Sequence, residues 1–188
     1  LVEHVKSTYI VGSPADDSVI VGPQVSKKQQ ERVLQYIKIG IDEGCEVALG
    51  GLGLPEPVAA SEPLTNGYYV KPTILTGVKP HYRIAQEEVF GPVIVVGTFK
   101  DYDDAIKIAN NSEYGLGSAV FSKDITVCHK FAQDVEAGMV WINSSNDVDI
   151  NIPFGGVKMS GHGRELGEYG LANFTNVKSV HVNLGNKL

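Results

Sequence analysis

The segment from residue 153 to residue 170, PFGGVKMSGHGRELGEYG, contains six glycines among its eighteen residues. Glycine inside a helix or strand is less favourable than alanine by roughly 0.5–1 kcal/mol, so this density predicts a shaped loop. Such a loop lets another backbone or a ligand approach closely. Its middle carries few bulky or charged side chains, namely Phe154, Lys158, Arg164 and Glu165. We therefore interpret this glycine-rich segment as one wall of a binding site.

A second candidate site begins with two adjacent carboxylates, Glu87 and Glu88, in the sequence EEVFGP. Phe90 and a Gly-Pro break follow them, and the apolar run VIVVGTF comes next, at residues 93–99. A short apolar run bounded in this way is typical of a buried strand. The pattern therefore places Glu88 at the turn that enters the strand, where its carboxylate either caps the turn or faces a ligand.

The chain contains two thiols, Cys45 and Cys128, and neither belongs to a CxxC or Cys/His spacing. This usage argues against a metal site and fits a reducing compartment, such as the cytoplasm or the mitochondrial matrix. Cys45 lies where a helix is expected to end, and Cys128 lies within an amphipathic helical pattern. We predict that both are buried structural thiols.

The net charge of the chain limits its partners. Its 16 basic and 22 acidic residues give a formal charge of −6, and the basic residues do not cluster on one face. The resulting field would repel nucleic acid and anionic membranes. No apolar run approaches the roughly 18 residues that a membrane-spanning helix needs. We therefore expect neither nucleic acid nor a membrane as a partner.

A long helix is predicted before these candidate sites. Ser26 is a good N-cap, and Gly44 is suited to the position that follows a helix C-terminus. Between them, Val33, Ile37 and Ile41 recur at intervals of four residues and define one apolar face. The other face carries Lys, Gln and Glu, so we expect it to contact solvent.

The regular part of the chain predicts the fold class. Strands are expected at residues 46–51, 67–75, 93–99, 116–121 and 139–143, with helices that begin at the N-caps Asp101 and Asp124. Alternating strands and helices predict an α/β fold with a mostly parallel open sheet between helices. Ligands of such sheets bind beyond the carboxyl ends of the strands, where the polar loop after residue 143 would lie.

The chain closes with the sequence FTNVKSVHVNL at residues 174–184, where valines alternate with polar residues. This pattern predicts a strand. A strand without a neighbour in sequence must pair with an edge elsewhere, on this subunit or on another.

Three motifs resemble those of the aldehyde dehydrogenase superfamily: EEVFGPV at 87–93, NNSEYGL at 110–116 and PFGGVKMSGHGRELGEYG at 153–170. Their order and intervals make the resemblance specific. It extends from about residue 11 to residue 182 but covers only the C-terminal part of a family member. It implies that residues 1–173 belong to a three-layer α/β/α catalytic domain and that residues 174–188 form an oligomerisation strand.

Members of this family are NAD(P)-dependent enzymes that convert aldehydes into carboxylic acids through a cysteine thioester. A cysteine thiolate attacks the aldehyde, hydride passes to the cofactor, and a glutamate activates the hydrolytic water. The resemblance places that cysteine, that glutamate and the dinucleotide-binding segment ahead of Leu1. We therefore expect this chain alone to be inactive, and the complete enzyme to act on a small-molecule aldehyde as a homodimer or homotetramer.

An alternative is a non-catalytic binding or assembly module that pairs through its C-terminal strand. A stand-alone nucleotide-binding domain is disfavoured, because no GxGxxG motif opens a helix in this chain.

The resemblance implies cofactor contacts from two segments. Glu88 would accept hydrogen bonds from the nicotinamide ribose hydroxyls, since a carboxylate offers two acceptor oxygens to a vicinal diol, and Phe90 would pack beside that ribose. Gln29, and less strongly Arg32, match a helix that touches the adenosine ribose, although the family pattern has lysine where this chain has Arg32. By composition alone, Gln29 and Arg32 are solvent-facing helix residues.

The resemblance also implies substrate and proton-handling residues. Phe154 would form an aromatic wall of the aldehyde tunnel, and its alternative is a core phenylalanine beneath a loop. Asn146 and Val148 would line the tunnel mouth, where many relatives carry an aromatic residue, so their small size suggests a wider entrance. Glu165 would pass protons and hold water behind the nucleophile. A glutamate in the first turn of a helix is also explained by the helix dipole.

Overall fold

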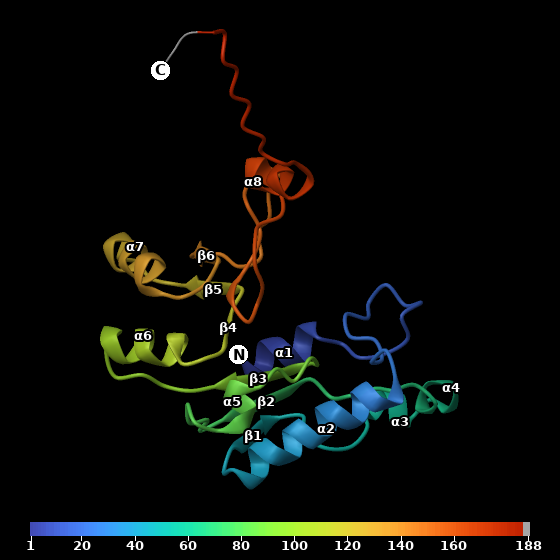
Figure 1. The fold of residues 1–188 in the computed structure, drawn as a ribbon. Helices are drawn as coiled ribbons and strands as arrows, with labels where there is room; N and C mark the ends of the chain where they lie inside the picture. Colours follow the sequence, from blue (N-terminus) through green and yellow to red (C-terminus); the bar gives the residue numbers. More distant parts are fainter. Residues whose placement is uncertain (186–188) are drawn as a thin grey trace. The chain divides into compact units, whose positions relative to one another are not determined.

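The computed structural model describes residues 1–185, except for the side chains of residues 62 and 63. The chain forms two compact units, and the second begins at Tyr102. Figure 1 labels the helices and strands of both units. Among the described residues, no helix is both long enough and apolar enough to cross a membrane.

The first unit contains eight elements, of which seven are short and one is a long helix. They are α1 (Val2–Thr8), α2 (Lys27–Asp42), β1 (Glu46–Leu49), α3 (Glu56–Ala59), α4 (Glu62–Thr65), β2 (Thr73–Thr76), α5 (Arg83–Gln86) and β3 (Val93–Val96). Strand β2 pairs antiparallel with β1 and parallel with β3, so the sheet order is β1-β2-β3.

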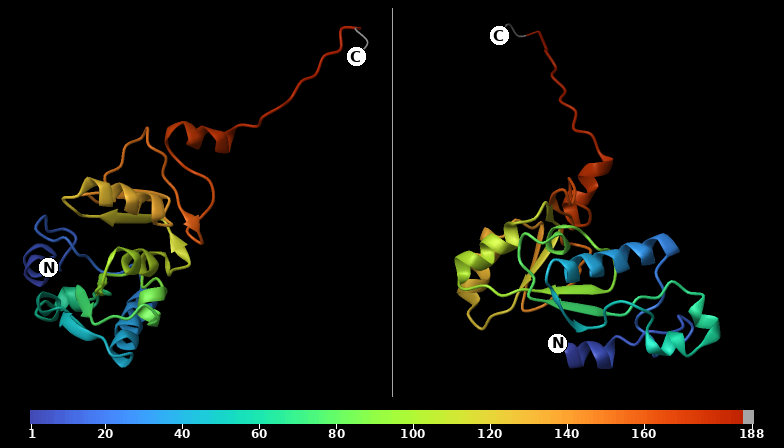
Figure 2. Two further views of the ribbon diagram at one scale, coloured as in Figure 1. Left: turned by 90° about the vertical axis from the view of Figure 1, so that its left-hand side faces the viewer. Right: turned by 90° about the horizontal axis from the view of Figure 1, so that it is seen from below.

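Helix α2 forms where its sequence predicts it. The Ser26 side chain accepts a 3.2 Å hydrogen bond from the Gln29 amide, and Gly44 follows the C-cap with a φ of 104°. Val33 and Ile37 are fully buried. They pack in one cluster with Val70 and the side chain of Val93 on β3. Helix α2 therefore lies along the sheet, as the views from the side and from below show (Figure 2).

Two strand predictions need correction in this unit. The strand expected at residues 67–75 forms only from Thr73, because Pro72 lacks the amide hydrogen that ladder pairing needs. The strand expected to be buried at residues 93–99 is β3, which is short and half exposed: β3 ends the row of paired strands, with β2 as its partner among the described residues.

In the second unit, one helix packs against a pair of parallel strands. The elements of this unit are α6 (Tyr102–Asn110), β4 (Tyr114–Gly115), β5 (Gly117–Val120), α7 (Ile125–Asp134), β6 (Met139–Ile142), β7 (Val157–Lys158), α8 (Gly167–Leu171) and a 3-10 turn, η1 (Ala172–Phe174). Strands β5 and β6 are parallel, and β4 pairs antiparallel with β7. The Asp124 carboxylate caps α7 as expected, accepting from the Thr126 amide at 2.9 Å.

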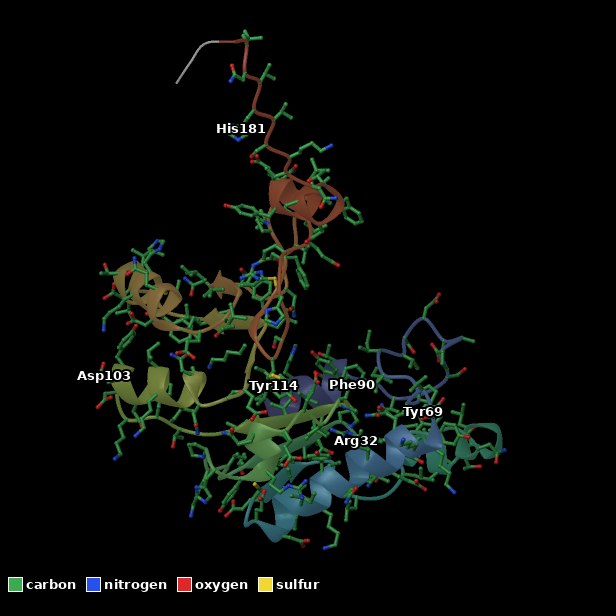
Figure 3. All side chains as sticks on the ribbon, viewed as in Figure 1. Arg32, Tyr69, Phe90, Asp103, Tyr114 and His181 are labelled. Carbon is green, nitrogen blue, oxygen red and sulfur yellow. The ribbon has the colours of Figure 1, made fainter. Side chains whose placement is uncertain are left out.

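The α/β fold class is confirmed by parallel strand pairs in both units and by helices between the strands. The strand predicted at residues 174–184 is not formed in this chain. From Thr175 to Gly185 the chain is exposed and makes no ladder, and Figure 3 labels His181 in this segment. Residues 186–188 of the predicted oligomerisation strand lie outside the described residues.

Candidate functional site

The turn at residues 87–90 is fixed by side chains from helix α2. The amide nitrogen Nε2 of Gln29 donates to the carbonyl oxygens of Phe90, at 2.8 Å, and of Val89, at 3.3 Å. The guanidinium of Arg32 donates to the carbonyl oxygen of Glu88 at 2.8 Å. Arg32 and Phe90 are labelled on the helix and on the turn in Figure 3. Gln29 and Arg32 therefore contact the turn backbone directly.

The first carboxylate of the pair is an anchor. The Tyr36 hydroxyl donates to Glu87 Oε2 at 2.5 Å, and Arg83 donates to both oxygens of Glu87, at 2.7 and 2.9 Å. The Arg83 hydrogen bonds, followed by the one from Tyr36, lower the pKa of Glu87 to about 2. The same carboxylate raises the pKa of Tyr36. Glu87 thus ties α2 and α5 to the start of the turn.

The second carboxylate has the opposite environment. Glu88 is exposed, and within residues 1–185 its carboxylate has no hydrogen bond or ion pair. Phe90 is 72% exposed, and its φ of 59° places a bulky residue in the left-handed region. Such exposed, held side chains are typical of a binding surface. Two free carboxylate oxygens beside an aromatic ring can accept a pair of hydroxyls.

The structure brings the residues predicted for this turn together, and their contacts with a cofactor stay a prediction. Glu88, Phe90 and Gln29 lie together in one unit, and Glu88 and Phe90 are free to contact a ligand. Gln29 and Arg32 were expected to face solvent or a cofactor, but their donors contact the turn backbone. Sequence reasoning missed Tyr36 and Arg83 as anchors, although their spacing from Gln29 and Glu87 on helix faces was a usable signal.

The glycine-rich segment is a shaped loop, as predicted, with a short strand and the start of a helix inside it. Phe154 and Glu165 form a two-way backbone bridge: each amide donates to the other carbonyl, at 2.8 and 2.7 Å. Arg164 closes the loop by donating to the carbonyls of Gly156 at 2.8 Å and Gly163 at 2.7 Å. Lys158, at a φ of 53°, donates to the carbonyls of Asn110 and Ser112.

Glu165 is not in the first turn of a helix, because α8 begins at Gly167. The helix-dipole explanation therefore does not apply to it. Its side chain is exposed beside a cavity of about 910 Å³ that Phe154, Arg164 and Asn173 also line. Within the described residues, no hydrogen bond or ion pair engages its carboxylate.

The three predicted substrate residues share a smaller hollow of about 240 Å³. Phe154, Asn146 and Val148 all line it. The remaining lining comes from Leu116, Gly117, Ser118, Ala119, Met139, Trp141 and Ser145, so the hollow has no charged side chain. Phe154 also lines the larger cavity, and it is half-buried rather than a core residue.

Trp141 is the residue that sequence reasoning missed in this hollow. Its indole Nε1 donates to the Asp147 carbonyl at 2.8 Å, which fixes the loop that carries Asn146 and Val148. A Cβ on Gly117 would lie 2.8 Å from the indole ring, so the facing strand has no side chain there. The sequence places this indole near the end of a strand and before a polar loop, which could have indicated that its N–H bonds to the loop.

The two cysteines are poor candidates for a nucleophile. Cys128 is fully buried, and Cys45 is 6% exposed. Burial, followed by the nearby charge of Glu43, raises the pKa of the Cys45 thiol, so little of it is the reactive thiolate. Among the described residues, no group of three or more His, Cys, Asp or Glu side chains is placed to hold a metal ion.

Comparisons with known proteins agree on one family. The model of the aldehyde dehydrogenase family matches residues 1–180. An aldehyde dehydrogenase-like protein of Schizosaccharomyces pombe is 46% identical over 186 residues, which cover 99% of this chain and 36% of that protein. NAD(P)+ aldehyde dehydrogenase 1 of Saccharomyces cerevisiae is 46% identical over 178 residues, which cover 91% of this chain and 33% of that protein.

Solved structures give the same result. Aldehyde dehydrogenase from Bacillus cereus matches with a TM-score of 0.88 and 45% identity, over 97% of this chain and 35% of that chain. The indole-3-acetaldehyde dehydrogenase of P. syringae, solved with NAD+ and IAA, matches with a TM-score of 0.90 and 38% identity, over 97% of this chain and 35% of that one. The chain therefore spans about one third of the length of the relatives it matches.

Proposed function

The chain belongs to the aldehyde dehydrogenase family, and on this premise we propose that it supplies the nicotinamide-ribose contacts and one aldehyde wall of an NAD(P)-dependent aldehyde dehydrogenase. The complete enzyme would oxidise an aldehyde to a carboxylic acid. The observation that carries the proposal is the contrast between Glu87, which is anchored, and Glu88, which is free on a fixed turn.

The residues of this turn fit a dinucleotide cofactor. The Glu88 carboxylate has two free acceptor oxygens for the two ribose hydroxyls, and the exposed Phe90 ring offers an apolar face beside them. The bound cofactor would accept the hydride that leaves the substrate. The role of Glu88 and Phe90 is to fix the position of the nicotinamide ribose, because a small error in hydride geometry lowers the rate strongly.

The hollow of about 240 Å³ fits the aldehyde side of the reaction. Phe154 and Val148 provide apolar contacts, and Asn146 adds a neutral polar group at the mouth. Since no charged side chain lines the hollow, it favours an uncharged aldehyde. We assign proton handling to Glu165, whose carboxylate is exposed to the adjoining cavity.

The chain by itself would lack the covalent step. Neither cysteine is accessible, and the family resemblance assigns the nucleophile to sequence outside this chain. We therefore propose that the isolated chain oxidises no aldehyde and that the complete protein does.

The test compares the isolated chain with the complete protein that carries this sequence. Both are incubated with acetaldehyde and either NAD+ or NADP+, and formation of the reduced cofactor is followed by absorbance. Turnover by the complete protein alone is the expected result. Turnover by the isolated chain, or none by the complete protein with any of a set of simple aldehydes, contradicts the proposal.

A role in assembly is favoured by one further observation. From residue 175 to residue 185 the backbone forms no strand ladder, and the exposed side chains of Val180, Val182 and Leu184 alternate with polar ones. Such a segment can add a strand to a sheet edge of a second copy. Light scattering of the complete protein should show a homodimer or homotetramer, and removal of residues 174–188 should lower the number of subunits. An unchanged number of subunits after truncation contradicts this role.

A further inference from the structure

We propose that Gln29 and Arg32 are positioning residues, which hold the 87–90 turn in its ribose-binding shape and do not bind the adenosine ribose. The inference rests on the proposed function, because it assumes that the turn meets the nicotinamide ribose. It differs from the role that the family resemblance implies, in which the same helix touches the other end of the cofactor.

The side-chain donors of Gln29 are directed at the backbone of the turn. An amide side chain has two N–H donors, and Nε2 of Gln29 lies within hydrogen-bond distance of two carbonyl oxygens, those of Val89 and Phe90. Both donors of Gln29 are then directed at the turn, and only its Oε1 is left to accept from a hydroxyl. These two bonds join residues 60 and 61 positions apart, so they fix tertiary structure and not the helix itself.

The guanidinium of Arg32 lies between the turn backbone and an aromatic ring of its own helix. Its Nη2 donates to the Glu88 carbonyl at 2.8 Å, and its guanidinium lies 4.9 Å from the centroid of the Tyr36 ring. A guanidinium that stacks on an aromatic ring and donates to a carbonyl has a restricted orientation. Arg32 therefore holds the backbone of Glu88 while the carboxylate of that residue stays free.

The backbone conformation of the turn at Phe90 needs stabilising contacts from outside the turn. Phe90 has a φ of 59°, a region that is unfavourable for a residue with a bulky side chain. Its carbonyl oxygen accepts the shorter of the two hydrogen bonds from Gln29, at 2.8 Å. A strained residue persists only where the surrounding structure holds it, and here the holding groups come from α2.

Close packing supports the same conclusion. A Cβ at Gly91 would lie 2.5 Å from Cγ2 of Val33, so the end of the turn is in direct contact with α2. Val33 is fully buried and cannot easily move. The side chains at 29, 32, 33 and 36 form one face of the helix, and all of them contact the turn or its neighbours. This face of α2 therefore contacts the segment at residues 87–91 from Gln29 to Tyr36.

The experiment separates positioning from direct binding by the choice of ligand. In the complete protein, a Gln29→Met/Arg32→Met variant removes the donors and keeps side-chain length and helix propensity. Lys28→Met is the matched control, because Lys28 is exposed on the same helix and its side chain has no hydrogen bond or ion pair among the described residues. Calorimetry then measures binding of NAD+ and of AMP, which contains the adenosine ribose only.

Positioning predicts that the double variant binds NAD+ about three- to tenfold more weakly, since only a fraction of the protein then holds the competent turn. AMP binding should be unchanged, and the control should match the wild type for both ligands. If AMP binding weakens as much as NAD+ binding, or if NAD+ binding is unaffected, the inference is wrong. If the wild-type protein binds neither ligand and oxidises no aldehyde, the proposed function fails as well.

Two further measurements guard against a general loss of structure. Hydrogen exchange without cofactor should speed up in the peptide that contains residues 87–91 and stay unchanged in β5 and β6. In a Glu88→Gln background, adding Arg32→Met should weaken NAD+ binding no further, because the two residues act through one contact. Additive losses would show that Arg32 binds the cofactor independently of Glu88.

Discussion

The Tyr36 hydroxyl donates a 2.5 Å hydrogen bond to Glu87, while the next residue, Glu88, keeps a free carboxylate. Two neighbouring glutamates thus have separate tasks. Glu87 joins the turn to helix α2, and Glu88 is free to meet the proposed ribose.

The depressed pKa of Glu87 predicts a pH-dependent stability. Its pKa falls from 4.5 to about 2 in the folded protein, so the unfolded chain binds this proton first as the pH falls. The stabilisation is therefore complete above about pH 4.5 and is lost progressively between pH 4.5 and pH 2. Urea unfolding at a series of pH values should show a steeper loss for the wild type than for Glu87→Gln. Parallel curves would contradict the assigned anchor.

The contact between Gly91 and Val33 predicts a steric effect. Gly91→Ala places a Cβ 2.5 Å from a fully buried Val33, so it should destabilise the protein by about 1–3 kcal/mol. It should also weaken NAD+ binding, because the turn must move away from α2. Adding Val33→Ala makes room and should restore part of the lost NAD+ affinity. If that second change only adds to the loss, the contact does not set the shape of the turn.

Helix α2 and its capping could be predicted from the sequence because they depend on local rules. Ser26 and Gly44 lie at the ends that their side-chain chemistry favours, and Val33 and Ile37 are buried as their spacing requires. The roles of Gln29 and Arg32 could not be predicted in this way, since their hydrogen bonds reach residues 56 to 61 positions away. Local patterns show which face a residue occupies, not which backbone it will meet.

The residues proposed for the aldehyde also divide into features that local sequence predicts and features that it does not. The sequence predicts the glycine-rich segment as a loop, which the structure confirms, and Phe154, Asn146 and Val148 line one hollow, where their contact with a substrate stays a prediction. The alternative explanation of Glu165 by a helix dipole is wrong, because α8 begins only at Gly167. The strand predicted at residues 174–184 forms no ladder with the described residues of this chain, and its pairing with another subunit stays a prediction.

Trp141 should influence the aldehyde and not the cofactor. Trp141→Phe keeps an aromatic ring against Gly117 but removes the donor to the Asp147 carbonyl. Loss of a hydrogen bond worth about 0.5–1.5 kcal/mol should loosen the loop of Asn146 and Val148 and raise the KM for the aldehyde by roughly two- to tenfold. The KM for NAD+ should not change. A variant with equal effects on both KM values would argue against this role.

Lys158 should stabilise the glycine-rich segment. Its ammonium donates to the carbonyls of Asn110 and Ser112, at 2.9 and 3.0 Å, and forms an ion pair with Glu136. Lys158→Met removes the charged donor from both carbonyls, of which that of Asn110 still accepts from the Ser112 amide at 2.9 Å, and should lower the free energy of unfolding by about 1.5–3 kcal/mol. Lys123→Met, at an exposed lysine, serves as the control in denaturant titrations. Equal stability of the two variants would exclude the anchor role.

The most direct measurement is a crystal structure of the complete protein with NAD+ bound. Our account predicts that both carboxylate oxygens of Glu88 lie within about 3.2 Å of the nicotinamide ribose hydroxyls, with Phe90 beside the ribose and Gln29 still bound to the turn. A cofactor whose nicotinamide ribose is bound elsewhere, with Glu88 turned to solvent, would contradict it.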